Sequence, residues 1–177
     1  MPRAKSPAAD PLQLSVQFGT GRRGVPHAKR MRAWADAAYL AHVNFHSSKP
    51  NQRRARKQSA PPAQVSLRIV GAAESRKLNR DWRGKDNSTN VLSFPAGDVL
   101  TPHGERYSLG DLAICVPVVV REAKQQHKQA DAHWAHMVIH GVLHLLGYDH
   151  ENERDANVME GCEKKILEQF GFSDPYE

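Results

Sequence analysis

Three histidines in the last quarter of the chain have the spacing of a metal site. His140 and His144 are four residues apart, which on an α-helix places both imidazoles on one face, about 6 Å apart along the axis. Gly147 follows, and glycine most easily adopts the left-handed conformation that ends a helix. The chain can then turn back and bring His150 to the same point. Three imidazoles that leave one position open are typical of a catalytic zinc, whereas a structural zinc has four protein ligands. We therefore predict one Zn²⁺ per chain, bound by His140, His144 and His150.

A helical pair of histidines alone would be weak evidence, because a chain with ten histidines contains such pairs by chance. The glycine break and the third histidine make the pattern specific. The same spacing occurs in the metzincin proteases, H-E-x-x-H-x-x-G-x-x-H, but Gly141 stands where those proteases have their general-base glutamate. Without that carboxylate, peptide hydrolysis is the weaker interpretation.

The segment 140–150 also closely resembles the signature of the YbeY family of metal-dependent endoribonucleases. A second segment is similar to another signature of that family and contains Asn79, Arg83, Lys85, Asp86 and the run T-N-V-L-S-F-P at 89–95. A third, L-G-D-L-A-I-C at 109–115, is similar to its remaining signature. Together these matches run from about position 78 to 150, and the remainder of the chain is compatible with the family in order and length.

The resemblance implies a cytoplasmic, zinc-dependent endoribonuclease that is specific for single-stranded RNA. It further implies a role in small-subunit ribosomal RNA 3′-end processing and in ribosome quality control. The implied partners are ribosomal RNA, ribosomal subunits and ribosome-associated proteins.

Cleavage of a phosphodiester also requires cations around the phosphate oxygens. Arg83 is the best candidate for a catalytic and substrate-binding role, because its planar guanidinium matches a phosphate at two points. The alternative is a surface salt bridge from Arg83 to Asp81 or Asp86, which would contribute little. The resemblance favours the role at the phosphate, and Lys85 is a weaker candidate for the same task.

Two residues are candidates for contacting the metal ligands without binding the metal themselves. His136 lies one turn before His140, and a hydrogen-bonded position is favoured over a proton carrier because the ion already has three ligands. Asp149 precedes a ligand and is expected either to support an imidazole or to cap the helix. The general base is not identified, and either water or the RNA 2′-hydroxyl remains open as the nucleophile.

Composition is that of an ordinary globular chain. With 177 residues and 40% hydrophobic residues, we expect a leader at 1–11 without order and one metal-hydrolase-like domain at 12–177. No run of eighteen apolar residues occurs, so we expect no membrane partner. Cys115 and Cys162 form no C-x-x-C motif, which fits a reducing cytoplasm. A net charge of +6 favours a polyanionic partner but is weak evidence alone.

Hydrophobic periodicity predicts strands at 12–18, 65–70, 91–95 and 109–116. It predicts helices at 26–46, 72–82, 117–127, from about 131 to the histidines, and at 153–170. Between the first helix and second strand, residues 47–62 form an insertion with five basic residues. It is interpreted either as a contact for the RNA backbone or as a solvated, mobile loop.

The predicted fold class is α+β. The helix that bears the histidines is apolar on nearly every other side, so it should be the buried central helix. We expect about four strands in a small sheet packed on this helix, and the resemblance implies a mixed, mostly parallel sheet with flanking helices. Three functions are compatible with the chain: an endoribonuclease, which is favoured, a metal-dependent hydrolase of another bond, and a non-catalytic, metal-stabilised ribosome assembly factor.

Overall fold

The computed structural model describes residues 11–47, 61–97 and 107–177. The predictions made for the leader and for nearly all of the basic insertion at 47–62 lie outside the described residues. No described helix combines the length and the apolar character that crossing a bilayer requires.

The described residues form four strands and five helices, in the order β1 (Leu12–Phe18), α1 (Ala28–Ser47), β2 (Ala63–Val70), α2 (Ala72–Arg83), β3 (Val91–Pro95), β4 (Tyr107–Cys115), α3 (Val116–Gln125), α4 (Ala130–Leu145) and α5 (Glu153–Glu168). Every predicted strand and helix is present, and the boundaries differ by a few residues at most.

The strands form a single sheet in the order β1-β2-β4-β3. β1, β2 and β4 run parallel, and β3 pairs antiparallel with β4 at the edge, with Val91 opposite Ile114. The predicted mixed, mostly parallel sheet of four strands is therefore confirmed. Alternate residues of each strand point to opposite faces, which explains why the sheet has two separate apolar clusters.

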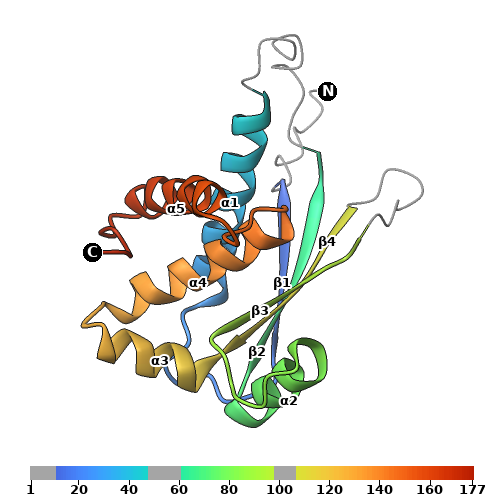
Figure 1. The fold of residues 1–177 in the computed structure, drawn as a ribbon, viewed down its shortest axis with the longest axis vertical. Helices are drawn as coiled ribbons and strands as arrows, with labels where there is room; N and C mark the ends of the chain where they lie inside the picture. Colours follow the sequence, from blue (N-terminus) through green and yellow to red (C-terminus); the bar gives the residue numbers. More distant parts are fainter. Residues whose placement is uncertain (1–10, 48–60, 98–106) are drawn as a thin grey trace, which may run out of the picture.

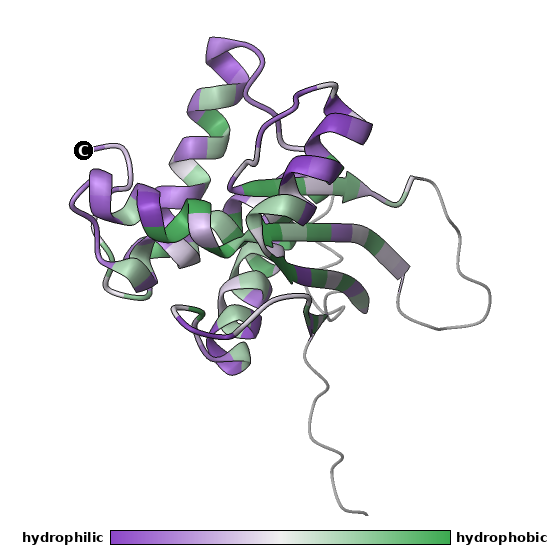
Figure 2. Ribbon diagram, turned by 90° about the horizontal axis from the view of Figure 1, so that it is seen from below, coloured by the Kyte–Doolittle hydropathy of each residue, from purple (hydrophilic) through white to green (hydrophobic). Residues whose placement is uncertain are grey.

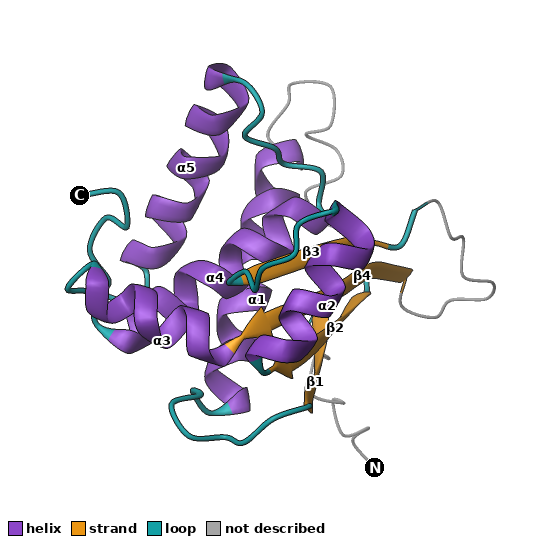
Figure 3. Ribbon diagram, turned by 60° about the horizontal axis from the view of Figure 1, so that its bottom comes forward, coloured by secondary structure: helices purple, strands orange, loops and turns teal. Residues whose placement is uncertain are grey.

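Helices cover both faces of the sheet (Figures 1 and 3). α1 and α4 pack on one face around the large core, with α5 outside them, while α2 covers the small cluster on the other face. Figure 2 shows the apolar residues concentrated on the strands and on the helix surfaces that face them, and the hydrophilic residues on the outer helices.

The helix that bears two of the histidines, α4, lies at the centre of the large core. Trp134, Val138, Ile139, Val142 and Leu143 are each at most 1% exposed, so the prediction of a buried central helix is confirmed. Apolar side chains on nearly every side of α4 leave few directions open to solvent, and its C-terminal end, with the histidines, is one of them.

Gly141 sets the distance between α4 and the sheet. A Cβ atom at this position would lie 2.9 Å from Leu112 Cδ2 and 3.3 Å from Val91 Cγ2. The Ser93 hydroxyl donates a hydrogen bond to the Gly141 carbonyl at 3.3 Å, which ties the edge strand β3 to the same turn of α4. Glycine here therefore brings the histidine-bearing end of α4 close to β3.

Gly141→Ala should lower the free energy of unfolding by about 1 kcal/mol. Overpacking a filled core costs about 1–3 kcal/mol, and the better helix propensity of alanine returns at most about 1 kcal/mol. Gly161→Ala in α5 is the matched control, because a Cβ there meets no atom within 4 Å. Gly161→Ala should raise the free energy of unfolding by about 0.5–1 kcal/mol. Urea unfolding measures both, and equal effects of the two substitutions would contradict this account of Gly141.

α2 is one residue longer than predicted. It continues through Arg83, so Arg83 ends the helix and does not lie in the loop that follows; Gly84, with a φ of 69°, provides the left-handed stop. Leu78 is only half-buried, and the buried side chains of α2 are the polar Ser75 and Asn79. The Ser75 hydroxyl donates to the Thr89 carbonyl at 2.9 Å, and the Asn79 amide donates to the Asn87 carbonyl at 2.8 Å. α2 thus holds the segment that leads into β3.

Candidate metal centre

A glycine turn at the end of α4 brings the third histidine back to the other two. Gly147 has a φ of 87°, and two backbone bonds close the turn, from Gly147 N–H to the His144 carbonyl and from Tyr148 N–H to the Leu143 carbonyl. This is the Schellman arrangement that ends many helices. The imidazole nitrogens of His140, His144 and His150 consequently lie within 4.8 Å of one another. The structure therefore brings together all three residues that the sequence predicts as ligands.

The hydrogen bonds of two histidines fix which nitrogen faces the centre. His140 Nδ1 lies 2.7 Å from a carboxylate oxygen of Glu163, and His144 Nδ1 lies 3.0 Å from the Tyr148 carbonyl. Because a carboxylate and a carbonyl only accept, each Nδ1 must carry a proton. In the neutral imidazoles both Nε2 atoms then present lone pairs, and these two atoms lie 3.1 Å apart. Two lone pairs at this separation repel each other, so the donor set fits a cation.

Burial favours the metal-binding form of His144. It lowers the pKa of this imidazole, and the neighbouring His140 and His150 lower it further. A lowered pKa keeps His144 neutral to more acidic pH, and a neutral imidazole is the form that binds a metal.

Glu163 is the functional residue that sequence reasoning missed. It comes from α5 and is fully buried, and its carboxylate accepts hydrogen bonds from His140 Nδ1 and from the Tyr176 hydroxyl. Burial alone would raise the pKa of Glu163, but hydrogen bonds from His136 and His140 outweigh burial and lower it to about 2. An ionised carboxylate behind a ligand histidine orients the ring and raises its basicity.

A signal for Glu163 was present in the sequence. It lies four residues after Met159 and three before Ile166, on the apolar face of a helix that was predicted correctly apart from its end. A lone acidic residue on a buried face needs a partner, because burying an unpaired charge is costly. The pattern thus indicated a buried acceptor, although it did not indicate which residue donates to it.

The other predicted supporting residues occupy different places. His136 Nε2 lies 3.5 Å from Glu163 Oε2, so His136 contacts the carboxylate that holds His140. Asp149 accepts a hydrogen bond from the backbone N–H of His150 at 2.7 Å, so its carboxylate orders the returning turn, and its negative charge partly offsets the lowering of the pKa of His144. His133 is buried against Glu122 at 3.0 Å, one turn before His136.

The three histidines open into a pocket of about 480 Å³. Besides the histidines, its lining consists of Trp82, Arg83 and residues 89–95. Arg83 thus shares one pocket with the predicted metal ligands. Lys85 is exposed on the turn after α2 and does not line this pocket.

The surface salt bridge considered for Arg83 is not formed. Asp86 is held by Arg76 in two hydrogen bonds of 2.8 and 2.6 Å, and Asp81 lies 3.1 Å from Arg80. Both carboxylates are therefore engaged by other cations of the same helix. Within the described part of the chain, Arg83 has no ion pair that competes with a bound phosphate.

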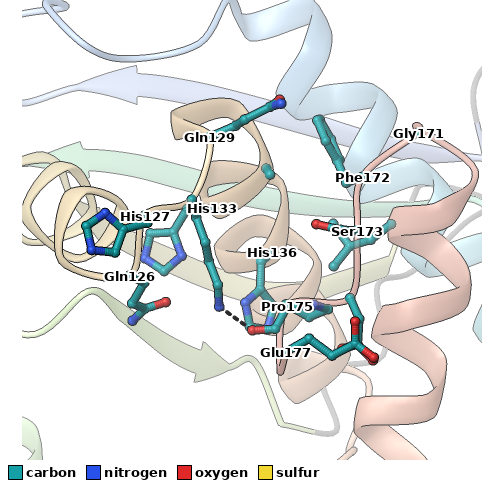
Figure 4. A pocket seen from close by; sticks show the side chains of 14 residues that line it. Gln126, His127, Gln129, His133, His136, Gly171, Phe172, Ser173, Pro175 and Glu177 are labelled. Carbon is teal, nitrogen blue, oxygen red and sulfur yellow. Dashed lines mark hydrogen bonds between the residues drawn. The ribbon is translucent and has the colours of Figure 1, made fainter.

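A second pocket, of about 410 Å³, is lined by His133 and His136 together with residues near the C-terminus (Figure 4). The C-terminal residues Phe172, Ser173 and Pro175 face the turn between α3 and α4 across it, and Lys128 donates a hydrogen bond to the Pro175 carbonyl. None of the three predicted ligands lines this pocket.

Glu163→Gln should weaken zinc binding by about 10- to 100-fold, which is typical for loss of a carboxylate behind a ligand histidine. The amide keeps the size of the side chain, but it has no charge and only one acceptor oxygen for His136 and His140. Competition with a zinc-binding dye measures the change. Glu168→Gln, exposed on the same helix, serves as control and should bind zinc like the parent. Equal affinities of all three proteins would contradict the role of Glu163.

The same substitution should change the acid stability of the metal-free protein. Glutamate titrates near 4.5 when unperturbed and near 2 in this fold, so ionised Glu163 stabilises the fold above about pH 4.5. This contribution, roughly 3 kcal/mol, is lost as the pH falls from about 4.5 towards 2. In Glu163→Gln the free energy of unfolding should fall less steeply over that range, and an equally steep fall would argue against an ionised Glu163.

Comparison with known proteins agrees with this geometry. The family model described as Endoribonuclease YbeY matches residues 36–171. Proteins named Endoribonuclease YbeY are similar over almost the whole chain: one from Pseudomonas syringae pv. tomato is 53% identical, covering 93% of this chain and 88% of its own, and one from Alkalilimnicola ehrlichii is 45% identical, covering 95% and 93%.

A solved structure is also similar. The solution structure of a Thermotoga maritima protein has a TM-score of 0.52 at 25% identity and covers 93% of this chain and 99% of its own. The region matched by the family model begins within α1, ends just after α5 and includes the three histidines, Arg83 and Glu163. This chain therefore belongs to the Endoribonuclease YbeY family.

Proposed function

We propose that this protein is a zinc-dependent endoribonuclease that cleaves single-stranded RNA. The observation that carries the proposal is the pair of Nε2 lone pairs 3.1 Å apart, which a cation would satisfy, in a pocket shared with Arg83. His140, His144 and His150 would hold the ion. The names of the relatives support RNA as the substrate.

Zinc is the ion that best suits this donor set. Three neutral imidazoles with an open position match its preference for nitrogen ligands in a catalytic site. A bound Zn²⁺ supplies a Lewis acid for phosphoryl oxygens. The residues of the chain contribute orientation: Glu163 and the Tyr148 carbonyl fix the rings of His140 and His144 through their Nδ1 protons.

Arg83 would bind the scissile phosphate. Its guanidinium can contact two phosphate oxygens, and this contact strengthens as negative charge builds up in the transition state. Arg83 is placed by the last turn of α2, which Ser75 and Asn79 connect to the segment before β3. Thus the Arg83 guanidinium and the histidines approach the pocket from opposite sides of the sheet.

The peptidase alternative has little support. A side chain at position 141 would begin against Leu112 and Val91, so the position of the metzincin glutamate is used here for packing. The family relationship favours RNA in addition.

Within the cell, we propose small-subunit ribosomal RNA as the substrate, with 3′-end processing and ribosome quality control as the roles. Ribosomal subunits would then be the partners that deliver the RNA. Sedimentation with purified subunits tests this part, and it is supported if the protein migrates with them at physiological salt.

Purified protein, with and without chelator, tests the proposed activity on single-stranded RNA, on duplex RNA and on casein. We expect cleavage of single-stranded RNA that stops with chelator and returns with zinc. The chemistry of the new RNA ends also identifies the nucleophile, because attack by the 2′-hydroxyl leaves a cyclic phosphate. Cleavage of casein with intact RNA would instead indicate a peptidase, and RNA that is bound but never cut would indicate a non-catalytic assembly factor.

A further inference from the structure

Trp82 is the most exposed of the large apolar side chains in the described residues. It is 72% exposed, whereas the other two tryptophans, Trp34 and Trp134, are each 1% exposed and lie in the core. Burying an aromatic side chain is one of the larger gains available to a folding chain. An indole left in water thus contributes little to the stability of the fold, which leaves it available for a ligand.

The position of Trp82 connects it to the candidate metal centre. It lies in the last turn of α2, next to Arg83, and lines the same pocket as the three histidines. Its ring contacts Phe94 of β3 edge to face, with centroids 5.7 Å apart and an angle of 70° between the planes. This contact supports the indole from the sheet side while most of the residue remains accessible.

We propose that Trp82 binds an unpaired RNA base by stacking, at the nucleotide next to the scissile phosphate. This inference rests on the proposed RNA cleavage and adds the group that selects the conformation of the substrate. Consecutive residues, Trp82 and Arg83, would then contact the base and the phosphate of one segment of the strand. Because the Arg83 guanidinium lines the same pocket, a nucleotide is favoured as the occupant over an apolar segment of a protein.

Stacking on Trp82 also accounts for a preference for single strands. A base inside a duplex is already stacked on both faces, so it cannot reach an indole without being unpaired first. An unpaired base has a free face and needs no hydrogen bond to a particular edge. The preference that results is therefore for unpaired RNA, with little selection of sequence.

Fluorescence tests the contact without relying on activity. Since only Trp82 among the three tryptophans is exposed, quenching on addition of a 2′-O-methyl RNA hexamer reports on this residue. The hexamer must remain intact on a gel after the titration. We expect saturable quenching in the parent and none in Trp82→Phe, in which only the buried tryptophans remain. Fluorescence of the parent that is unchanged at saturating hexamer would overturn the proposal.

Cleavage kinetics test what the contact contributes. Trp82→Leu should raise the KM for single-stranded RNA by roughly tenfold, with kcat and zinc content close to the parent, because stacking is a binding interaction. Trp82→Phe should recover most of the loss, since it keeps an aromatic face. Phe45→Leu is the matched control: Phe45 is 52% exposed but lines a separate pocket, between α1, the turn after α4 and α5, that contains none of the three histidines. It should cleave like the parent.

RNA substrates with a single abasic nucleotide identify the base. An abasic nucleotide at one position beside the cleavage site should weaken RNA binding to the parent protein by roughly tenfold. The same abasic RNA should bind Trp82→Leu no more weakly than the unmodified RNA does. If Trp82→Leu cleaves with the KM of the parent and no abasic position matters, the stacking proposal is wrong while the endoribonuclease stands. If the parent cuts no RNA, the proposed function fails, and the fluorescence titration still decides whether Trp82 binds bases.

Discussion

His144→Ala should leave the protein without bound zinc and without RNA cleavage. Two imidazoles hold zinc far less well than three, and His144 lies between the other two predicted ligands, with its ring centre 4.5 Å from that of His140 and 5.0 Å from that of His150. The parent should contain about one zinc per chain by elemental analysis. Loss of the ion removes several kcal/mol of stabilisation of the transition state, so cleavage should fall by at least about 10³-fold.

The control for this prediction is His27→Ala. His27 is exposed just before α1 and is not among the described residues that are grouped closely enough to hold a metal ion. It should retain zinc and activity. Full zinc occupancy in purified His144→Ala would show that the ion, if any, is held elsewhere. Circular dichroism of both variants, recorded with zinc present, separates a loss of metal from a loss of fold.

Arg83→Ala should retain the zinc and the fold and lose about 10²–10³-fold in the rate of single-turnover RNA cleavage, or about 3–4 kcal/mol. That is the usual effect of removing one donor that stabilises developing charge. Arg83→Lys should recover only part of the rate, because an ammonium keeps the charge but cannot make a two-pronged contact. Melting temperature and zinc content should be close to those of the parent in both variants, since Arg83 is exposed.

Arg80→Ala is the matched control for Arg83, since it removes an arginine from the same helix that pairs with Asp81 and does not line the pocket. It should change the free energy of unfolding by about 0–1 kcal/mol and leave cleavage nearly normal. If Arg83→Ala cuts RNA at close to the parent rate, the phosphate-binding cation is another residue, and Lys85 is the next to test.

The histidine site was predictable because it is local. His140, His144, Gly147 and His150 lie within eleven residues, and helical geometry plus one glycine turn is enough to bring them together. Periodicity predicted the elements for the same reason, because the side-chain pattern of a strand or a helix depends on near neighbours.

The rest depends on contacts between distant residues. Glu163 is 23 positions from His140, and their hydrogen bond exists only because α5 packs outside α4. Likewise, β4 lies between β2 and β3 although it follows both in the chain, and no local pattern specifies such an order. The end of α2 was misplaced by one residue. The predicted helix ends before Arg83, whereas the observed helix includes Arg83 and stops at Gly84, which has a left-handed conformation.

The hydrogen bond between His140 and Glu163 would make the proposed metal part of the energetics of the whole C-terminal region. A ligand that binds only the folded state adds RT ln(1 + [L]/Kd) to its stability, or about 1.4 kcal/mol for each tenfold excess over Kd. His150 and Glu163 belong to the turn after α4 and to α5, and Tyr176 of the C-terminal tail donates to the same carboxylate. Zinc scarcity would therefore loosen this region before the sheet, and a cell short of zinc would lose the protein to proteolysis as well as its activity.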